Sequence, residues 1–176
     1  MEESFTDQPS ETAGFLVARQ EGDIAQCRSP ICLRLIDYWQ GLAMRNNGHP
    51  EWRQVRLMDL YKIASFLAVK DVIGNGADFH NRFWGTGLTD ALGFEATNKR
   101  VSSYEPVGMR DAVRQRYVRV TRTGEPEMVR GHISTIPGHE HVPYEAVHLP
   151  LWGEEGSVRQ IISGYHFGFV AEVDEV

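Results

Sequence analysis

The clearest pattern of hydrophobic positions follows Ser29 and Pro30, a pair that suits the N-cap and first turn of a helix. Hydrophobic residues then recur at helical spacing as far as Asn46, and their neighbours widen the stripe. The stripe is Ile31, Leu35, Tyr38 and Leu42, flanked by Cys32, Ile36, Trp39 and Ala43. A helix is therefore predicted over residues 31–46, with a face wide enough to be buried against a sheet or a second copy of the chain.

Five shorter runs have the composition of β-strands. Residues 69–73 and 79–84 are separated by Gly74, Asn75 and Gly76, and Asn-Gly supplies the positive φ of a tight hairpin turn. The other three runs, 128–136, 142–151 and 159–171, follow one another with only loops between them. Strands that are neighbours in sequence usually pair as antiparallel neighbours, so these three are predicted to do so.

Helical patterns separate the two groups of strands. A helix is predicted over residues 104–120 and ends before Gly124, with Val107, Val113, Tyr117 and Val120 facing inward. A short helix over 86–92 has Thr86 as its N-cap and ends at Gly93, and a weaker one covers 59–66. Helices and strands are thus segregated along the chain, which predicts an α+β fold with an antiparallel sheet.

Composition and charge narrow the classes of function. The chain has 176 residues, 18 Lys and Arg against 24 Asp and Glu, a net charge of −6, and 41% hydrophobic residues. These values are typical of one globular domain, and without a basic cluster they disfavour nucleic acid as a partner. No apolar run approaches the length of a membrane span and the first residues are acidic, so a cytoplasmic protein without membrane contact is expected. Cys27 and Cys32 fit no disulfide framework or zinc pattern and are expected to be reduced thiols.

One block of residues carries a resemblance to a known family. The block is Phe79-His-Asn-Arg82-Phe-Trp-Gly85-Thr86, followed by Gly93, Thr97 and Tyr104, and preceded by Tyr38-Trp39, Arg45, Pro50, Arg53 and Leu57. With these residues the chain resembles PAS family 5, a set of short bacterial proteins related to the PAS sensory domain. The resemblance covers most of residues 31–105 and, more loosely, 106–170.

The resemblance implies a fold and a division of the chain. A PAS domain has a five-stranded antiparallel sheet of order 2-1-5-4-3 with central helices on one face, and here an N-terminal helix precedes it. The acidic, polar composition of residues 1–28 indicates a mobile arm. The segments expected after it are the N-terminal helix and connector (29–56), a PAS-like sensory domain (57–171) and a tail (172–176). Arg82 lies between apolar residues of a strand and is expected to pair with a carboxylate or a carbonyl.

Members of the PAS superfamily bind small molecules between the sheet and the central helices. The corresponding wall here is Phe79, Asn81, Phe83, Met109, Val113, Tyr117, His132, Val147, Tyr165 and Phe167. The same side chains would equally serve to fill a core. On the other face of the last strand, Gly164 and Gly168 leave room for the N-terminal helix. A flavin–cysteine adduct is disfavoured because residues 86–104 hold no cysteine, and haem bound through the central helix is disfavoured because residues 104–123 hold no histidine.

Catalytic and metal-binding patterns are weak. His139-Glu140-His141 follows Pro137-Gly138 and is typical of a solvated loop tip, so no metal site is predicted. No nucleophile, phosphate-binding or metalloprotease motif is present, so no catalytic residue is predicted. The alternative that stays open is a small enzyme that uses His132 and His166 as acid/base groups.

These features predict a stand-alone sensor or adaptor that binds a small molecule or a protein partner and regulates a signalling protein in trans. The helix face formed by Ile31, Leu35, Tyr38, Trp39 and Leu42 is predicted to form a homodimer or partner interface. Trp39→Asp would then convert a dimer to a monomer. A structural interaction domain without any ligand is the remaining alternative.

Overall fold

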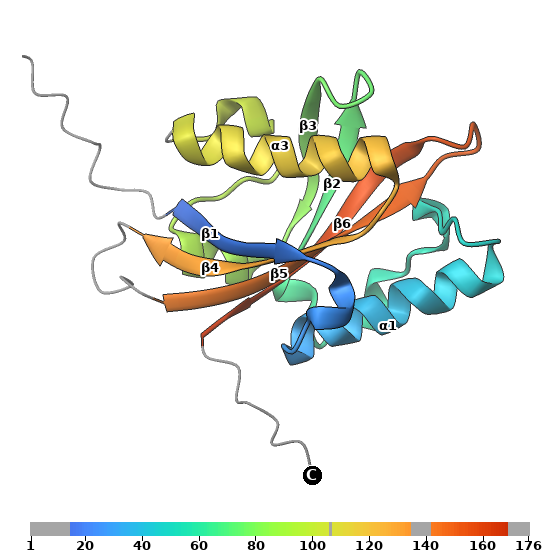
Figure 1. Cartoon of the computed structure of the whole chain (residues 1–176), viewed down its shortest axis with the longest axis horizontal. Helices are drawn as coiled ribbons and strands as arrows, with labels where there is room; N and C mark the ends of the chain where they lie inside the picture. Colours follow the sequence, from blue (N-terminus) through green and yellow to red (C-terminus); the bar gives the residue numbers. More distant parts are fainter. Residues whose placement is uncertain (1–14, 106, 135–141, 169–176) are drawn as a thin grey trace, which may run out of the picture.

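Six strands form one antiparallel sheet in the part of the chain that the computed structural model describes, residues 15–105, 107–134 and 142–168 (Figure 1). The strands are β1 (Phe15–Gly22), β2 (Leu67–Ile73), β3 (Asp78–Trp84), β4 (Glu127–Ser134), β5 (Val142–Trp152) and β6 (Val158–Phe167). Three α-helices accompany them: α1 (Pro30–Arg45), α2 (Thr86–Leu92) and α3 (Val107–Thr123). The α+β class and the antiparallel pairing predicted from the sequence are confirmed.

The number and order of the strands differ from the expected five-stranded sheet. The observed order is β1-β4-β5-β6-β2-β3, because β1 adds an edge strand beside β4. The other five strands follow one another as β3-β2-β6-β5-β4. Backbone groups along β4 would otherwise be unpaired at an open edge, and β1 satisfies them. Gly131 permits this pairing, since a Cβ there would collide with the carbonyl oxygen of Val17.

The mobile arm predicted over residues 1–28 is therefore wrong for its second half. Residues 15–22 belong to the sheet, and a 3-10 turn over Ile24–Gln26 leads from β1 to α1. Residues 1–14, and the boundary expected at 171, lie outside the described residues.

Helices α1 and α3 cover opposite faces of the sheet (Figure 1). On α1 the side chain of Ser29 caps the helix by accepting a hydrogen bond from the Cys32 backbone N–H at 3.3 Å, as the sequence predicted. Its apolar stripe lies on β5 and β6, where a Cβ added to Gly164 would stand 3.0 Å from Leu35. On the other face the Tyr117 hydroxyl of α3 meets the Tyr165 hydroxyl of β6 at 3.1 Å. We call these two sides the α1 face and the α3 face.

The hairpin of β2 and β3 forms as predicted, with positive φ at Gly74, Asn75 and Gly76. Arg82 donates to the Asp71 carboxylate at 2.9 Å, which confirms the expected partner. A bulge falls at the same place: Val69 pairs with Phe83 but Lys70 pairs with Asn81. The extra residue reverses the alternation of β3 beyond this point.

Three local predictions about helices are wrong. The helix expected over residues 59–66 is two 3-10 turns, Leu57–Leu60 and Ala64–Phe66. The N-cap of α2 is Gly85 and not Thr86. Position 85 has to be glycine, because a Cβ there would collide with the carbonyl oxygen of Ser65. Helix α3 begins at Val107, which is 49% exposed and not part of its buried side.

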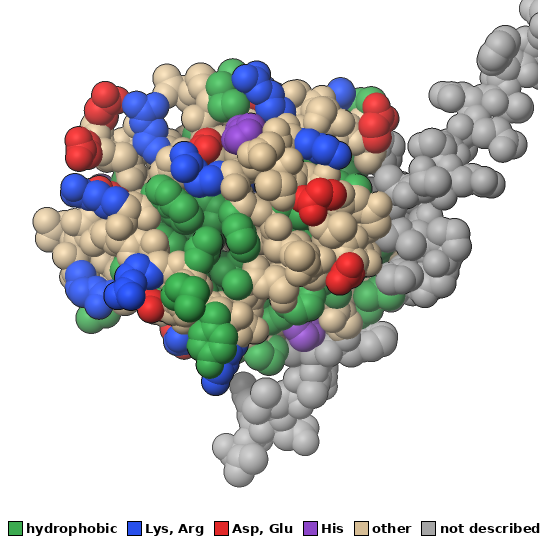
Figure 2. Space-filling model, turned by 180° about the vertical axis from the view of Figure 1, so that it is seen from behind, with side chains coloured by type: hydrophobic (Ala, Val, Ile, Leu, Met, Phe, Trp, Pro, Cys, Tyr) green, Lys and Arg blue, Asp and Glu red, His purple; other side chains and the backbone are tan. Residues whose placement is uncertain are grey.

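The outer surface carries several large apolar side chains. Seen from behind, hydrophobic side chains gather in a patch on that face of the molecule (Figure 2). The large hydrophobic residues that stay exposed are Leu33, Met44, Met58, Tyr61 and Val107. Among the helices described, none is long and apolar enough to cross a membrane.

Candidate functional site

A small cavity lies on the α3 face of the sheet. Its volume is about 20 Å³, room for roughly one water molecule. The wall is aromatic and aliphatic and comes from β1, β3, β6, α2, α3 and the segment after α2. The lining side chains are Leu16, Trp84, Leu92, Phe94, Tyr104, Met109, Val113, Tyr117 and Tyr165.

Seven of the ten side chains predicted to bind a ligand lie on this face. Met109, Val113, Tyr117 and Tyr165 line the cavity itself. Beside it, Phe79 packs edge-on against Tyr117 with ring centroids 5.4 Å apart, and Asn81 is fully buried. Phe167 is half-buried at the rim, where it stacks on Tyr165.

Phe83, His132 and Val147 lie on the α1 face, and their predicted place in the ligand site is corrected here. The bulge in β3 turns Phe83 away and turns Trp84 inward instead. Val147 pairs with Gly164, and His132 alternates in step with Arg130, whose partner Glu145 is on the α1 face. Strict alternation along each strand was the wrong guide where the bulge interrupts it.

Lys70 is the most unusual residue of this interior. Its side chain is fully buried on the α3 face, and its Nζ has no hydrogen-bond partner among the described residues. The Nζ atom lies 4.7 Å from the ring centroid of Tyr117 and 5.7 Å from that of Trp84. These rings attract the ammonium but replace only part of its hydration. Burial lowers the pKa of Lys70 from 10.5 to about 7, with no carboxylate opposing it among the described residues.

His148 and Ser163 stand beside Lys70 on the same face. The His148 Nδ1 and the Ser163 hydroxyl are 2.8 Å apart, and the imidazole Nε2 has no partner among the described residues. Burial, with the positive charges of Arg116 and Lys70, holds the pKa of His148 well below its ordinary 6.5. The imidazole is therefore neutral at physiological pH.

Three tyrosines bring hydroxyl groups to the cavity. The Tyr117 and Tyr165 hydroxyls share one hydrogen bond, and the Tyr104 hydroxyl accepts one from the Asn81 amide at 2.6 Å. Burial raises the pKa of Tyr104, Tyr117 and Tyr165, so all three stay protonated. We call Lys70, Asn81, Tyr117, His148, Ser163 and Tyr165 the Lys70 cluster.

Sequence reasoning missed Lys70, His148 and Ser163. One signal was present: Lys70 interrupts the apolar residues that begin β2. A charged residue inside such a run is either at an edge or functional, and only the cross-strand register shows that β2 is central and that Lys70 faces inward.

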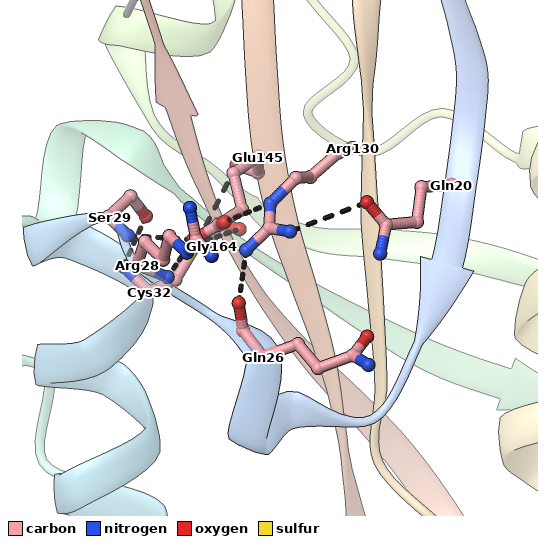
Figure 3. Close-up of polar contacts among 8 residues, drawn as sticks. All are labelled: Gln20, Gln26, Arg28, Ser29, Cys32, Arg130, Glu145 and Gly164. Carbon is pink, nitrogen blue, oxygen red and sulfur yellow. Dashed lines mark hydrogen bonds and ion pairs between the residues drawn. The ribbon is translucent and has the colours of Figure 1, made fainter. Parts of the chain in front are cut away.

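The α1 face holds a second polar group, which fastens α1 to the sheet (Figure 3). One oxygen of the buried Glu145 carboxylate accepts from the backbone N–H groups of Arg28 and Ser29 at 2.9 and 2.8 Å. The other accepts from Arg130 at 2.7 Å. Burial alone would raise the pKa of Glu145, but the hydrogen bonds and Arg130 outweigh burial and lower it. Every oxygen of Glu145 is thus occupied, and its role here is structural.

The helix residues predicted to form an interface serve the chain's own core. Leu35, Trp39 and Leu42 are buried, and the Trp39 indole N–H donates to the Pro150 carbonyl at 2.8 Å. Ile31 and Tyr38 are half-buried. Of the two possibilities for this face, the stripe packs on the chain's own sheet, so the Trp39 side chain is not available for the predicted interface.

The other candidate residues, the two cysteines and the strand histidines, do not line the cavity. Burial raises the pKa of the Cys27 thiol to about 12 and raises that of Cys32 further, so neither is a ready nucleophile. His132 and His166 are half-buried on the α1 face, away from the cavity. Within the described residues no three His, Cys, Asp or Glu side chains come together as metal ligands. His139, Glu140 and His141 lie outside those residues.

Comparison with known proteins identifies no family for this chain. No family model matches it, and no curated protein matches it. A solved structure that is similar is a sensory box histidine kinase/response regulator from Burkholderia thailandensis E264. The two chains share 10% sequence identity with a TM-score of 0.39, and the match covers 64% of this chain and 84% of the other. The resemblance to PAS family 5 therefore stays a prediction.

Proposed function

We propose that this chain is a PAS-like sensory module that binds a small molecule on the α3 face of its sheet. The observation that carries the proposal is the small, mostly apolar cavity next to a buried cluster. In that cluster Lys70, Asn81 and His148 each keep one polar atom without a partner among the described residues. Unpaired buried polar atoms cost free energy, and they are rare in a core that only has to be stable. An apolar pocket with a few polar groups is the usual make-up of a small-molecule site.

The cavity has to enlarge to take up a ligand, and its wall is built from separate segments that could move apart. Three separate segments, β1, α2 and the start of α3, contribute Leu16, Leu92 and Met109 to its wall. Methionine has an unbranched, adaptable side chain that repacks easily. Movement of α2 and the residues after it would open the cavity without breaking the sheet.

Binding would be read out through β6. Tyr165 points to the cavity, while its neighbour Gly164 is the close contact of Leu35 on α1. A ligand that moves the Tyr165 hydroxyl therefore acts on a strand against which α1 is packed directly. In the proposed role, this changes how the module docks on a signalling protein in trans; the homodimer stays a prediction.

Native mass spectrometry of the freshly purified protein tests the proposal. Excess mass over the denatured chain, or a rise in melting temperature with a compound from a metabolite panel, is expected. Val113→Phe, which fills the cavity, should abolish either signal. Ala112→Leu, on the exposed side of the same helix, should leave it intact. A bare mass together with no compound that raises the melting temperature would contradict the proposal.

A further inference from the structure

We propose that the ligand of this module is a small carboxylate, whose charge pairs with the ammonium group of Lys70. This inference rests on the proposed function and adds the chemical class of the ligand. It is carried by the position of Lys70, a cation side chain that is fully buried and without a hydrogen-bond partner among the described residues.

The polar groups around the cavity are an unbalanced set. Tyr104 accepts a hydrogen bond from Asn81, so its own proton is free to be donated, and the Tyr117–Tyr165 pair uses only one of its two protons. Together with the Nζ of Lys70, the site offers several donors, while the Asn81 Oδ1 is an acceptor without a partner among the described residues. The ammonium of Lys70 is the charged group of this set, so a ligand that brings anionic acceptor oxygens would neutralise it.

The carboxylates on the α3 face pair with arginines and not with Lys70. Arg116 lies on α3 next to Tyr117, is 4% exposed, and pairs with Glu21 at 3.0 Å. The buried Glu145 carboxylate is on the α1 face and is occupied by its own donors. Glu127, which lies opposite His148 on this face, pairs with Arg119 at 2.6 Å. No carboxylate among the described residues pairs with Lys70, so its charge has no anionic partner there. An anionic group would be stabilised there by Lys70, whereas a cationic ligand would be repelled.

The aromatic wall of the cavity determines which hydrocarbon part the carboxylate ligand can have. Trp84 and Tyr117 touch both the cavity and Lys70, so a carboxylate bound at Lys70 would have its hydrocarbon part against these rings. The initial cavity is small, which favours a short or flat hydrocarbon part. Acetate, butyrate and benzoate are therefore suitable probes of increasing size.

Carboxylate binding would be coupled to a proton. Lys70 is the group of the cluster that changes charge near neutral pH: His148 titrates well below its ordinary 6.5, Tyr104, Tyr117 and Tyr165 titrate above 10, and Arg116 stays charged. Above pH 7 the free protein has to take up a proton at Lys70 to pair with the carboxylate. The affinity should then fall about tenfold for each pH unit above this value.

The experiment is calorimetric titration of the full chain at pH 6.5 and 8.5. The probes are acetate, butyrate and benzoate, each with its uncharged amide: acetamide, butyramide and benzamide. We expect at least one carboxylate to bind at least tenfold more tightly than its amide at pH 6.5. We expect that preference to disappear in Lys70→Met, which keeps the length of the side chain, and to persist in Lys62→Met, which removes an exposed lysine.

A second readout needs no variant. In protein labelled with ¹³C at the lysine side chains, the bound carboxylate should raise the pKa of Lys70, and the matching amide should not. Amides that bind as well as carboxylates, or a carboxylate preference that survives in Lys70→Met, would overturn the inference and leave the proposed function standing. If neither carboxylates nor amides bind and the purified protein has a bare mass, both fail.

Discussion

Replacing Lys70 by methionine should make the ligand-free protein more stable, and the gain should depend on pH. The side chain of Lys70 is buried without a hydrogen-bond partner among the described residues, so its ammonium form loses hydration on folding. Methionine fills nearly the same volume with no charge.

The magnitude follows from the pKa of Lys70. That pKa is about 7 in the folded chain against an ordinary value of 10.5, and each pKa unit corresponds to about 1.4 kcal/mol. Protonated Lys70 therefore costs roughly 5 kcal/mol below pH 7. Between the two pKa values the unfolded chain holds one proton more than the folded chain, so the stability of the wild type rises with pH in this range.

Urea denaturation at pH 6.5, 7.5, 8.5 and 9.5 measures this difference. The free energy of unfolding of Lys70→Met should exceed that of the wild type most at pH 6.5, and the excess should shrink by about 1.4 kcal/mol per pH unit above pH 7. Lys62→Met, at an exposed position, should show no such slope. An excess that stays constant over these pH values, or a variant less stable than the wild type at pH 6.5, would refute the reasoning.

Three further predictions concern the framework of the fold. Glu145→Gln should lower the free energy of unfolding by roughly 3 kcal/mol at pH 7 in urea denaturation. This loss should shrink as the pH falls through the lowered pKa of the Glu145 carboxyl, whereas Glu155→Gln, in an exposed loop, should change the free energy little. Gly131→Ala should destabilise the protein by more than about 2 kcal/mol in thermal melts, because the new Cβ collides with β1. Gly108→Ala, whose new Cβ meets nothing within 4 Å, should be neutral or stabilising. Trp39→Asp should lower the melting temperature sharply rather than only change the oligomeric state, since this side chain is 9% exposed; a fully folded, monomeric variant would count against that view.

Several elements of the fold could be predicted from residues that are close together in the sequence. Helix α1 follows from the Ser29 cap and the apolar stripe behind it, and the β2–β3 hairpin follows from Asn75 and its neighbouring glycines. Both depend on residues close together in the chain. The inward side of α3, with Val113, Tyr117 and Val120, follows in the same way from helical spacing.

The other features depend on long-range pairing. The apolar part of β1 is short, and its partner β4 lies far along the chain, so nothing near Phe15 marks it as a strand. The bulge beside Arg82 changes which side chain faces the cavity, and period-two alternation cannot show it. The burial of Lys70 depends on β3 and β6 lying on either side of β2, which is a property of the sheet order.

The place of β1 also has a consequence for how the chain folds during synthesis. Residues of β1 such as Leu16 are made first, but their partners in β4 emerge from the ribosome more than one hundred residues later. Until then β1 has no neighbour to pair with, and the β2–β3 hairpin is the part of the sheet that can form. Contacts this distant in sequence make folding slow, because the loop between them is closed at an entropic cost. β1 is therefore made early but can dock only after β4 has emerged, and the cavity wall to which Leu16 contributes cannot be complete before then.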